Sequence, residues 1–220
     1  MGPRKRSNAV NLFGMKDFFA RLLAGPTPVD TSAALSGFLA AQSAFIAQKC
    51  VIEYCRARAG INWDKLFKEQ AFVDAMEACR WEAYGAVLAD VTVLAEGRLR
   101  APAGAASARL PDRLIDLAGQ ALRHFGPAGN GRGEDWADVL APLHDRLVRG
   151  QGADPLPAHA VGLVSGAAVY RLLPVHPDIR AHDRELVTNN IRFNLTQTAD
   201  TMDKRFAPGL AAAVLEAVPA

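Results

Sequence analysis

Hydrophobic positions between Thr31 and Gly60 predict one long helix that is apolar around most of its circumference. When residues are placed about 100° apart, the large side chains from Leu35 to Ile46 fall within one wide stripe, and small apolar residues cover the opposite side. The side chains of residues 30–32 can each cap the start of this helix, and Gly60 suits the left-handed position after its end. A helix that is apolar nearly all round is usually buried, so we expect it at the centre of the fold.

Polar side chains interrupt the large-hydrophobic stripe of this helix. They are Gln42, Lys49, Glu53 and Arg56. A charged group that is buried without a partner destabilises a protein strongly, so these residues should be paired with another helix or open to a cavity. The alternative is that the stripe turns toward water after Ile46 and the charges are solvated.

A second long helix is predicted from Glu69 to Arg98, with Asp90 in the middle of its apolar stripe. The connection to the first helix is short, so the two helices should lie antiparallel as neighbours. That arrangement places Asp90 near the level of Gln42, and it predicts an ion-pair ladder among Lys49, Glu53, Arg80 and Glu82. Trp81 and Tyr84 are interpreted as core or as the walls of a groove. The candidate ligand- or partner-binding residues are therefore Gln42, Lys49, Glu53, Arg56, Arg80, Trp81, Glu82, Tyr84 and Asp90.

The rest of the chain predicts further helices and no strand, because alanine is abundant and β-branched residues do not alternate with polar ones. Small residues at 101–109 predict a flexible linker, and glycine-rich loops separate helices expected over 111–125, 135–149, 158–173, 177–206 and 208–218. We therefore expect an all-α multi-helix bundle organised around two long antiparallel helices. Its parts are an arm at 1–29, a helical hairpin at 30–100, the linker at 101–109 and C-terminal helices at 110–220 that pack on the hairpin.

The last long helix carries an unusual number of amide side chains. Asparagine forms helices poorly, so Asn190 and Asn194, together with Arg192, are secondary candidates for specific contacts; a solvated face is the alternative.

His176 and His182 form the densest histidine group and are further secondary candidates, but the metal-binding spacings of zinc proteases and di-iron bundles are missing. We therefore expect neither a metal nor a cofactor.

Charge is unevenly distributed along the chain. Residues 1–30 hold five basic and two acidic side chains, a net charge of +3, and since the whole chain carries +2 the remainder carries −1. A basic main domain that would bind nucleic acid is therefore not expected. Within 1–29, apolar residues flanked by Lys16 and Arg21 could hold a short helix on an anionic membrane surface, or could simply pack on the domain.

Cys50, Cys55 and Cys79 match neither a disulfide framework nor a zinc motif, which favours a reducing cytoplasm. The apolar runs read as too interrupted to span a bilayer, and residues 1–30 lack the apolar core of a signal peptide. We expect a cytoplasmic protein, with membrane association through residues 1–29 as a further expectation.

Three classes of function fit this sequence. The first, which we favour because no catalytic spacing is found, is a non-enzymatic helical protein that binds a protein partner as an interaction or assembly factor. The second is a bundle that binds a small apolar molecule or a lipid in a cavity lined by Lys49, Glu53, Trp81 and Tyr84. The third is a hydrolase-like enzyme using Ser165, although the motif around this serine is not the GxSxG of hydrolases.

Overall fold

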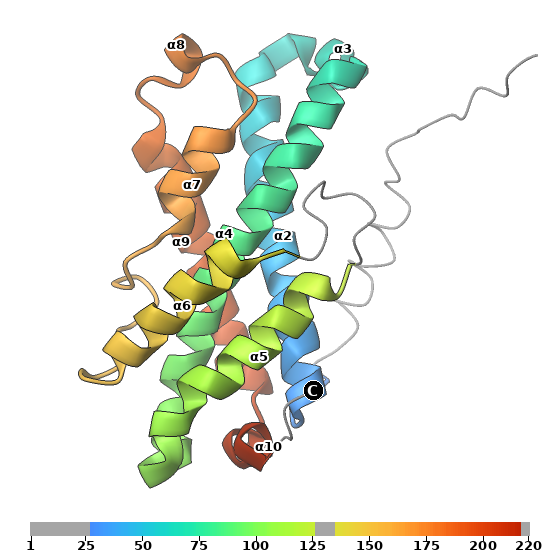
Figure 1. Cartoon of the computed structure of the whole chain (residues 1–220). Coiled ribbons are helices and arrows are strands. Elements are labelled where there is room, and N and C mark those ends of the chain that lie inside the picture. Colours follow the sequence, from blue (N-terminus) through green and yellow to red (C-terminus); the bar gives the residue numbers. More distant parts are fainter. Residues whose placement is uncertain (1–26, 126–134, 217–220) are drawn as a thin grey trace, which may run out of the picture.

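Two antiparallel helices, α2 and α4, form the axis of an all-α bundle (Figure 1). The computed structural model describes residues 27–125 and 135–216. The helices are α2 (Ser32–Ala59), α3 (Trp63–Leu66), α4 (Gln70–Ala103), α5 (Leu110–Arg123), α6 (Ala137–Gly150), α7 (Ser165–Leu172), α8 (Pro177–Arg180), α9 (Arg184–Arg205) and α10 (Leu210–Glu216). The all-α prediction and the pair of long helices are confirmed.

Local sequence signals determine both ends of α2. The hydroxyl of Thr31 accepts a hydrogen bond from the backbone N–H of Ala34 at 3.2 Å, which satisfies one first-turn donor. At the other end Gly60 adopts a φ of 55°, a conformation that is costly for residues with a Cβ atom. Between these ends Leu35, Leu39 and many small residues are buried, so α2 lies in the core as expected.

A short turn joins α2 to α4 and makes them neighbours. It consists of the 3₁₀-helix η1 (Gly60–Asn62) followed by α3. At the far end of α4, the residues predicted as a flexible linker are helical instead. Helix α4 continues to Ala103, and the 3₁₀-helix η2 (Gly104–Arg109) leads directly into α5. The alanines of this segment favour helix, and only Gly104, at φ 54°, changes the chain direction.

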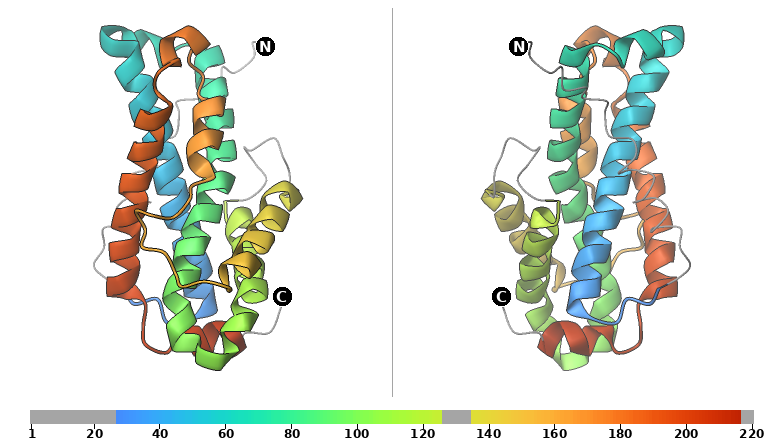
Figure 2. Two further views of the ribbon diagram at one scale, coloured as in Figure 1. Left: turned by 90° about the vertical axis from the view of Figure 1, so that its left-hand side faces the viewer. Right: turned by 90° about the vertical axis from the view of Figure 1, so that its right-hand side faces the viewer.

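The other helices cover the α2–α4 pair in two halves. Helix α9 runs alongside α2 and α4, while α5 and α6 pack on the half nearer the start of α2, and α7 packs on the opposite half (Figures 1 and 2). Helix α10 closes one end of the bundle, and α3 and α8 lie at the other end. One hydrophobic core extends through all these layers.

Two predicted helices are shorter than the sequence pattern suggests. Residues 158–164 are not helical, and helix α7 begins only at Ser165. The predicted helix over 177–206 is divided into α8 and α9. The side chain of Arg192 explains the first difference. It donates hydrogen bonds to the carbonyl oxygens of His159 and Val161, at 2.5 and 3.0 Å, and so holds a turn there by a tertiary contact.

The first described segment is joined to the end of α9 by backbone hydrogen bonds. The N–H of Val29 donates to the carbonyl of Arg205 at 2.8 Å, and the N–H of Ala207 donates to the carbonyl of Val29 at 3.0 Å. Val29 and Phe206 thus form an isolated β-bridge, and the described residues contain no regular strand. Of the arm and amphipathic helix predicted over residues 1–29, residues 1–26 lie outside the described residues.

Candidate functional site

Asp90 faces α6 and α7, not the polar residues of α2. Its fully buried carboxylate lies 2.6 Å from Nη1 of Arg146 and accepts hydrogen bonds from the hydroxyl of Ser165, at 2.5 Å, and from its N–H, at 3.0 Å. The N–H of Val164 also donates to it, at 3.2 Å. The expectation that Asp90 belongs with Gln42 in one polar seam is therefore wrong, because each side chain points to a different helix.

Gln42 belongs to a buried amide group between α2 and α9. Its carbonyl oxygen accepts a hydrogen bond from the hydroxyl of Thr198 at 3.2 Å. Asn194 lies one turn before Thr198 on α9, and Asn190 lies one turn before Asn194. The amide nitrogen of Asn194 donates at 2.8 Å to both the backbone and the side-chain oxygen of Asn190. Asn190 in turn accepts a weak bond from the thiol of Cys50, and burial raises the pKa of that thiol to about 12. The amides therefore join helices inside the core, as specific contacts and not as a solvated face.

The predicted ion-pair ladder between α2 and α4 does not form. Within the part of the chain that the structure describes, Lys49, Glu53 and Arg80 make no ion pair. The ammonium of Lys49 lies 5.6 Å from the ring centre of Phe45, Glu53 is exposed, and Arg80 donates to the side-chain oxygen of Gln48 at 3.0 Å. Burial lowers the pKa of Arg80. The alternative, in which this stripe turns outward after Ile46, describes α2 better; Glu82 lies half-buried on α4.

Aromatic rings fill the region where a cavity was expected. Trp81 and Phe125 are half-buried, whereas Tyr84 and Trp136 are buried, and their ring centres lie 5.7–6.4 Å apart in edge-to-face pairs. The hydroxyl of Tyr84 donates to the carbonyl of Ala121 at 2.5 Å. Such contacts close the space around Tyr84, so these aromatic side chains belong to the core.

A carboxylate that sequence reasoning missed anchors the loop between α6 and α7. Glu96 is 2% exposed and binds Arg100 through both oxygens, at 2.7 and 2.5 Å. Arg100 also donates to the carbonyls of Gly150 and Ala153, and Gln151 donates to Glu96 at 2.5 Å. The spacing of four residues between Glu96 and Arg100 is the sequence signal that could have found this pair.

A second missed group joins α2 to the start of α9. The hydroxyl of Tyr54 donates to Asp183 at 2.5 Å, and Arg58 forms an ion pair with the other oxygen of the same carboxylate. Burial, and then the bond to Asp183, raises the pKa of Tyr54 to about 12. The bond from Tyr54, with the charge of Arg58, holds the pKa of Asp183 below its usual value.

Apolar and basic side chains are exposed at the turn between α2 and α4. Ile61 is 97% exposed and Trp63 is 38% exposed. The guanidinium of Arg56 lies 4.4 Å from the ring centre of Trp63, a cation–π contact at the surface. Arg56, Ile61, Trp63 and Lys65 together are called the hairpin-tip surface below.

The remaining candidates do not assemble into a catalytic or metal site. His176 caps α8 by accepting from the N–H of Asp178 at 3.3 Å, His182 is exposed, and the hydroxyl of Ser165 is buried against Asp90. In the described ranges no three His, Cys, Asp or Glu side chains are grouped so that they could hold a metal ion. Cys50, Cys55 and Cys79 are buried thiols that form no disulfide.

One helical stretch, Ser32–Leu66, is long and apolar enough to cross a membrane by length and composition alone. The interpretation that all apolar runs are too interrupted does not hold for it. However, 61% of its most apolar window is buried inside the bundle, as is also typical of the core helix of a water-soluble protein.

Comparison of this chain with known proteins identifies no relative. The sequence matches no protein-family model, and searches of curated proteins and of solved structures find no match.

Proposed function

We propose that this protein is a non-enzymatic interaction or assembly factor that binds a protein partner through its hairpin-tip surface. The observation that carries the proposal is the 97% exposure of Ile61, beside the exposed ring of Trp63. Burying an isoleucine side chain contributes about 1.5–3 kcal/mol, and tryptophan and arginine are enriched among the residues that dominate binding energy. The burial of the Ser165 hydroxyl against Asp90 also favours this class over a hydrolase.

Charge at the tip indicates the chemistry of the partner. Lys68 pairs with Asp64 at 2.5 Å. Within the described residues neither Lys65 nor Arg56 forms an ion pair, and the guanidinium of Arg56 lies over the ring of Trp63. The surface therefore presents an apolar centre with two basic side chains beside it. A complementary partner has an apolar pocket for Ile61 with acidic residues at its rim.

Site-specific photo-crosslinking in the native host tests this surface. A photoreactive phenylalanine analogue at Ile61 is expected to crosslink one protein reproducibly, and the same analogue at Val148, an exposed residue of α6, is not. With that protein purified, Ile61→Asp should weaken binding at least about tenfold, because it places a charge in an apolar contact. Val148→Asp is the matched control, and an equal loss in both variants would refute the proposal.

We further propose that residues 1–26 can bring the protein to an anionic membrane surface, on the strength of their basic and aromatic composition. Flotation with liposomes containing phosphatidylserine would compare the full chain with a variant lacking 1–26. This truncation keeps Val29, whose backbone pairs with Arg205 and Ala207. Equal recovery of both proteins with the liposomes would contradict membrane binding by this segment.

A further inference from the structure

The solvent-facing side of α9 carries an uncharged stripe with two large apolar side chains. Leu186 and Phe193 are 57% and 60% exposed, and they lie seven positions apart on one face of the helix. The other exposed residues of this face are the amides Asn189 and Gln197. These four residues are called the outer stripe of α9 below. A helix face that stays in water usually carries charged side chains, so the outer stripe has the composition of a contact surface.

The outer stripe is too small to hold a free protein partner by itself. A stable interface between separate proteins buries about 800 Å² on each side, which takes about 20–30 residues. A segment of the same chain needs less contact, because its tether keeps it at an effective concentration of about 1 mM or more. The size of the stripe therefore favours a segment of this chain as its occupant.

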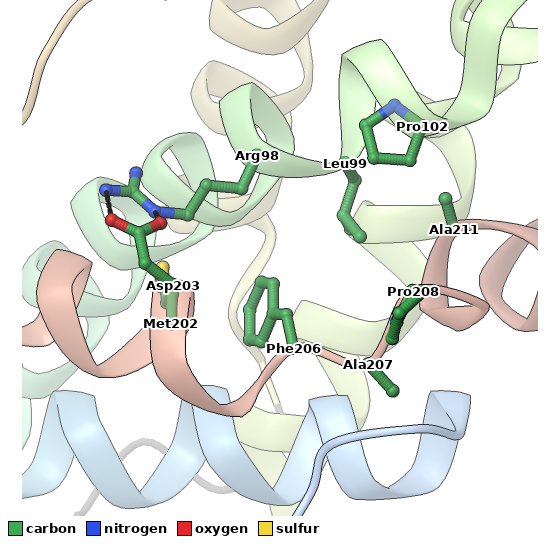
Figure 3. Close-up of a pocket in the computed structure, with 9 residues that line it drawn as sticks. All are labelled: Arg98, Leu99, Pro102, Met202, Asp203, Phe206, Ala207, Pro208 and Ala211. Atoms are coloured by element: carbon green, nitrogen blue, oxygen red, sulfur yellow. Dashed lines mark hydrogen bonds and ion pairs between the residues drawn. The ribbon is translucent and has the colours of Figure 1, made fainter.

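The N-terminal segment joins the bundle at a fixed point beside the last turn of α9. Arg98 of α4 pairs with Asp203 in that turn at 2.7 Å (Figure 3). Nε of Arg205 donates to the carbonyl of Thr27 at 2.9 Å, and the N–H of Val29 donates to the carbonyl of Arg205 at 2.8 Å. The residues before Thr27 are therefore tethered to the end of α9.

From this tether the N-terminal segment can reach the outer stripe. Phe193 lies 12 positions before Arg205, which is roughly 18 Å along α9. Residues 23–27, if extended, span up to about 14 Å, and one turn of a helix before them adds about 5 Å. Phe19 can therefore lie level with Phe193.

The short helix predicted within residues 1–29 has an apolar pattern that matches the outer stripe. Leu12 and Phe19 share one face of this helix and are seven positions apart, as Leu186 and Phe193 are on α9. The same face also carries Met15, Leu22 and Leu23. The tether at Thr27 makes the predicted helix run parallel to α9, so Leu12 comes level with Leu186 when Phe19 is level with Phe193.

Charges on the two segments are complementary. Residues 1–26 hold five basic side chains and one acidic side chain, a net charge of +4. Glu185 and Asp200 are exposed on either side of the outer stripe, and neither forms an ion pair with a described residue. A basic segment is therefore attracted to this part of α9.

We propose that residues 12–23 form a helix that packs parallel to α9 on its outer stripe, with Phe19 against Phe193 and Leu12 against Leu186. The docked helix hides the same apolar side chains that would enter a membrane, so the α9-bound and membrane-bound states exclude each other. The contact itself requires neither a membrane nor the hairpin-tip surface.

Hydrogen–deuterium exchange of the full chain, without liposomes, tests whether the segment docks. The amides of residues 12–23 should exchange at least about tenfold more slowly in the unmodified protein than in Phe193→Asp, because a charge in the apolar contact releases the helix. Val148→Asp, at an exposed residue of α6, is the matched control and should leave this exchange unchanged. Both replaced side chains are exposed, so both variants should keep the fold. Equal exchange of residues 12–23 in the unmodified protein and Phe193→Asp would overturn the proposal.

A thiol crosslink tests the direction of the docked helix and the identity of the occupant. Lys16 and Asn189 each precede the paired phenylalanine by about one turn, so they lie at similar heights. A short bismaleimide should join the thiols of Lys16→Cys/Asn189→Cys within one chain, but not those of Lys16→Cys/Asp145→Cys, where position 145 is exposed on α6. The native thiols are buried and should not react. Equal crosslinking of both pairs would refute the docked position, and crosslinks formed only between two chains would assign the stripe to a second copy and also refute it.

Discussion

The carboxylate of Asp90 and the guanidinium of Arg146 lie 2.6 Å apart although 56 residues separate them in the chain. Asp90 is fully buried, and its second oxygen accepts both the hydroxyl and the N–H of Ser165. Arg146 also donates to the carbonyl of Gly162 at 2.5 Å. One side chain of α4 therefore orients α6, the loop after it and the first turn of α7.

Replacing Asp90 by alanine should lower the free energy of unfolding by about 3–5 kcal/mol, because Arg146 and the N–H of Ser165 lose their partner in the core. Arg146→Ala should also destabilise clearly, because it leaves the fully buried carboxylate of Asp90 without its counter-charge, although the bonds from Ser165 and Val164 remain. Urea unfolding followed by circular dichroism measures both. Asp178→Ala, at an exposed carboxylate, is the control, and a similar small effect in all three variants would contradict this account of Asp90.

Glu96 and Glu53 form a matched pair of glutamates in opposite environments. Glu96→Gln should destabilise the protein by about 2 kcal/mol or more, because the buried bidentate bond to Arg100 loses its charge. Glu53→Gln should change stability by less than about 0.5 kcal/mol, since the side chain is exposed and unpaired among the described residues. Thermal melting of both variants tests this, and equal shifts would place Glu53 in the core after all.

Replacement by alanine should change the stability of the protein in opposite directions at two glycines. A Cβ atom at Gly85 would lie 2.9 Å from Cζ3 of the buried Trp136, so Gly85→Ala should destabilise by about 1–3 kcal/mol through overpacking. No atom beyond the adjoining backbone of α2 lies within 4 Å of a Cβ at Gly37, so Gly37→Ala should stabilise by about 0.5–1 kcal/mol. Chemical denaturation of the two variants in parallel checks the signs, and destabilisation by Gly37→Ala would disagree with this packing.

Alkaline pH should weaken the fold through its buried thiols. Burial raises the pKa of Cys55 and Cys79 from 9.0 to about 12. Below pH 9 the thiols are protonated in both states and their contribution is fully present; above it the unfolded chain ionises first, so stability is lost as pH rises toward 12. Unfolding free energies measured from pH 8 upward under reducing conditions should show this decline. A Cys55→Ala/Cys79→Ala variant should show a shallower slope between pH 9 and 10, and an unchanged slope would refute the assignment.

The helical periodicity of apolar residues and the capping residues at helix ends made the main helices predictable from sequence. The apolar residues of α2, its cap at Thr31 and its glycine at Gly60 are local features, and all appear in the structure. The linker was predicted wrongly because small residues are compatible with both coil and helix, and contacts with the rest of the bundle decide between them. The helical pattern of residues 158–164 is misleading for a related reason, since the side chain of Arg192, which binds their carbonyl oxygens, comes from a distant segment.

The expected grouping of Asp90 with Gln42 shows which property sequence spacing does not determine, namely the direction in which a side chain points. Counting along two antiparallel helices predicts the height of a residue, but the direction of its side chain depends on the rotation of each helix. Asp90 has the buried position that its stripe indicates, yet it faces α6 and α7. Its partner Arg146, like the partner of Tyr54 at Asp183, lies in a segment that no local pattern connects to it.

The contacts that close the bundle at Val29 and Ser32 also determine when it can fold during synthesis. Arg205 donates to the carbonyl of Thr27 across 178 residues, and Ser32 donates to the carbonyl of Ala213 across 181 residues. At about 5–20 residues per second, α2 leaves the ribosome on the order of ten seconds before these partners exist. Until then α2 can pack on α4 but not on α9, so the hydrogen bond from Thr198 to Gln42 can form only near the end of synthesis.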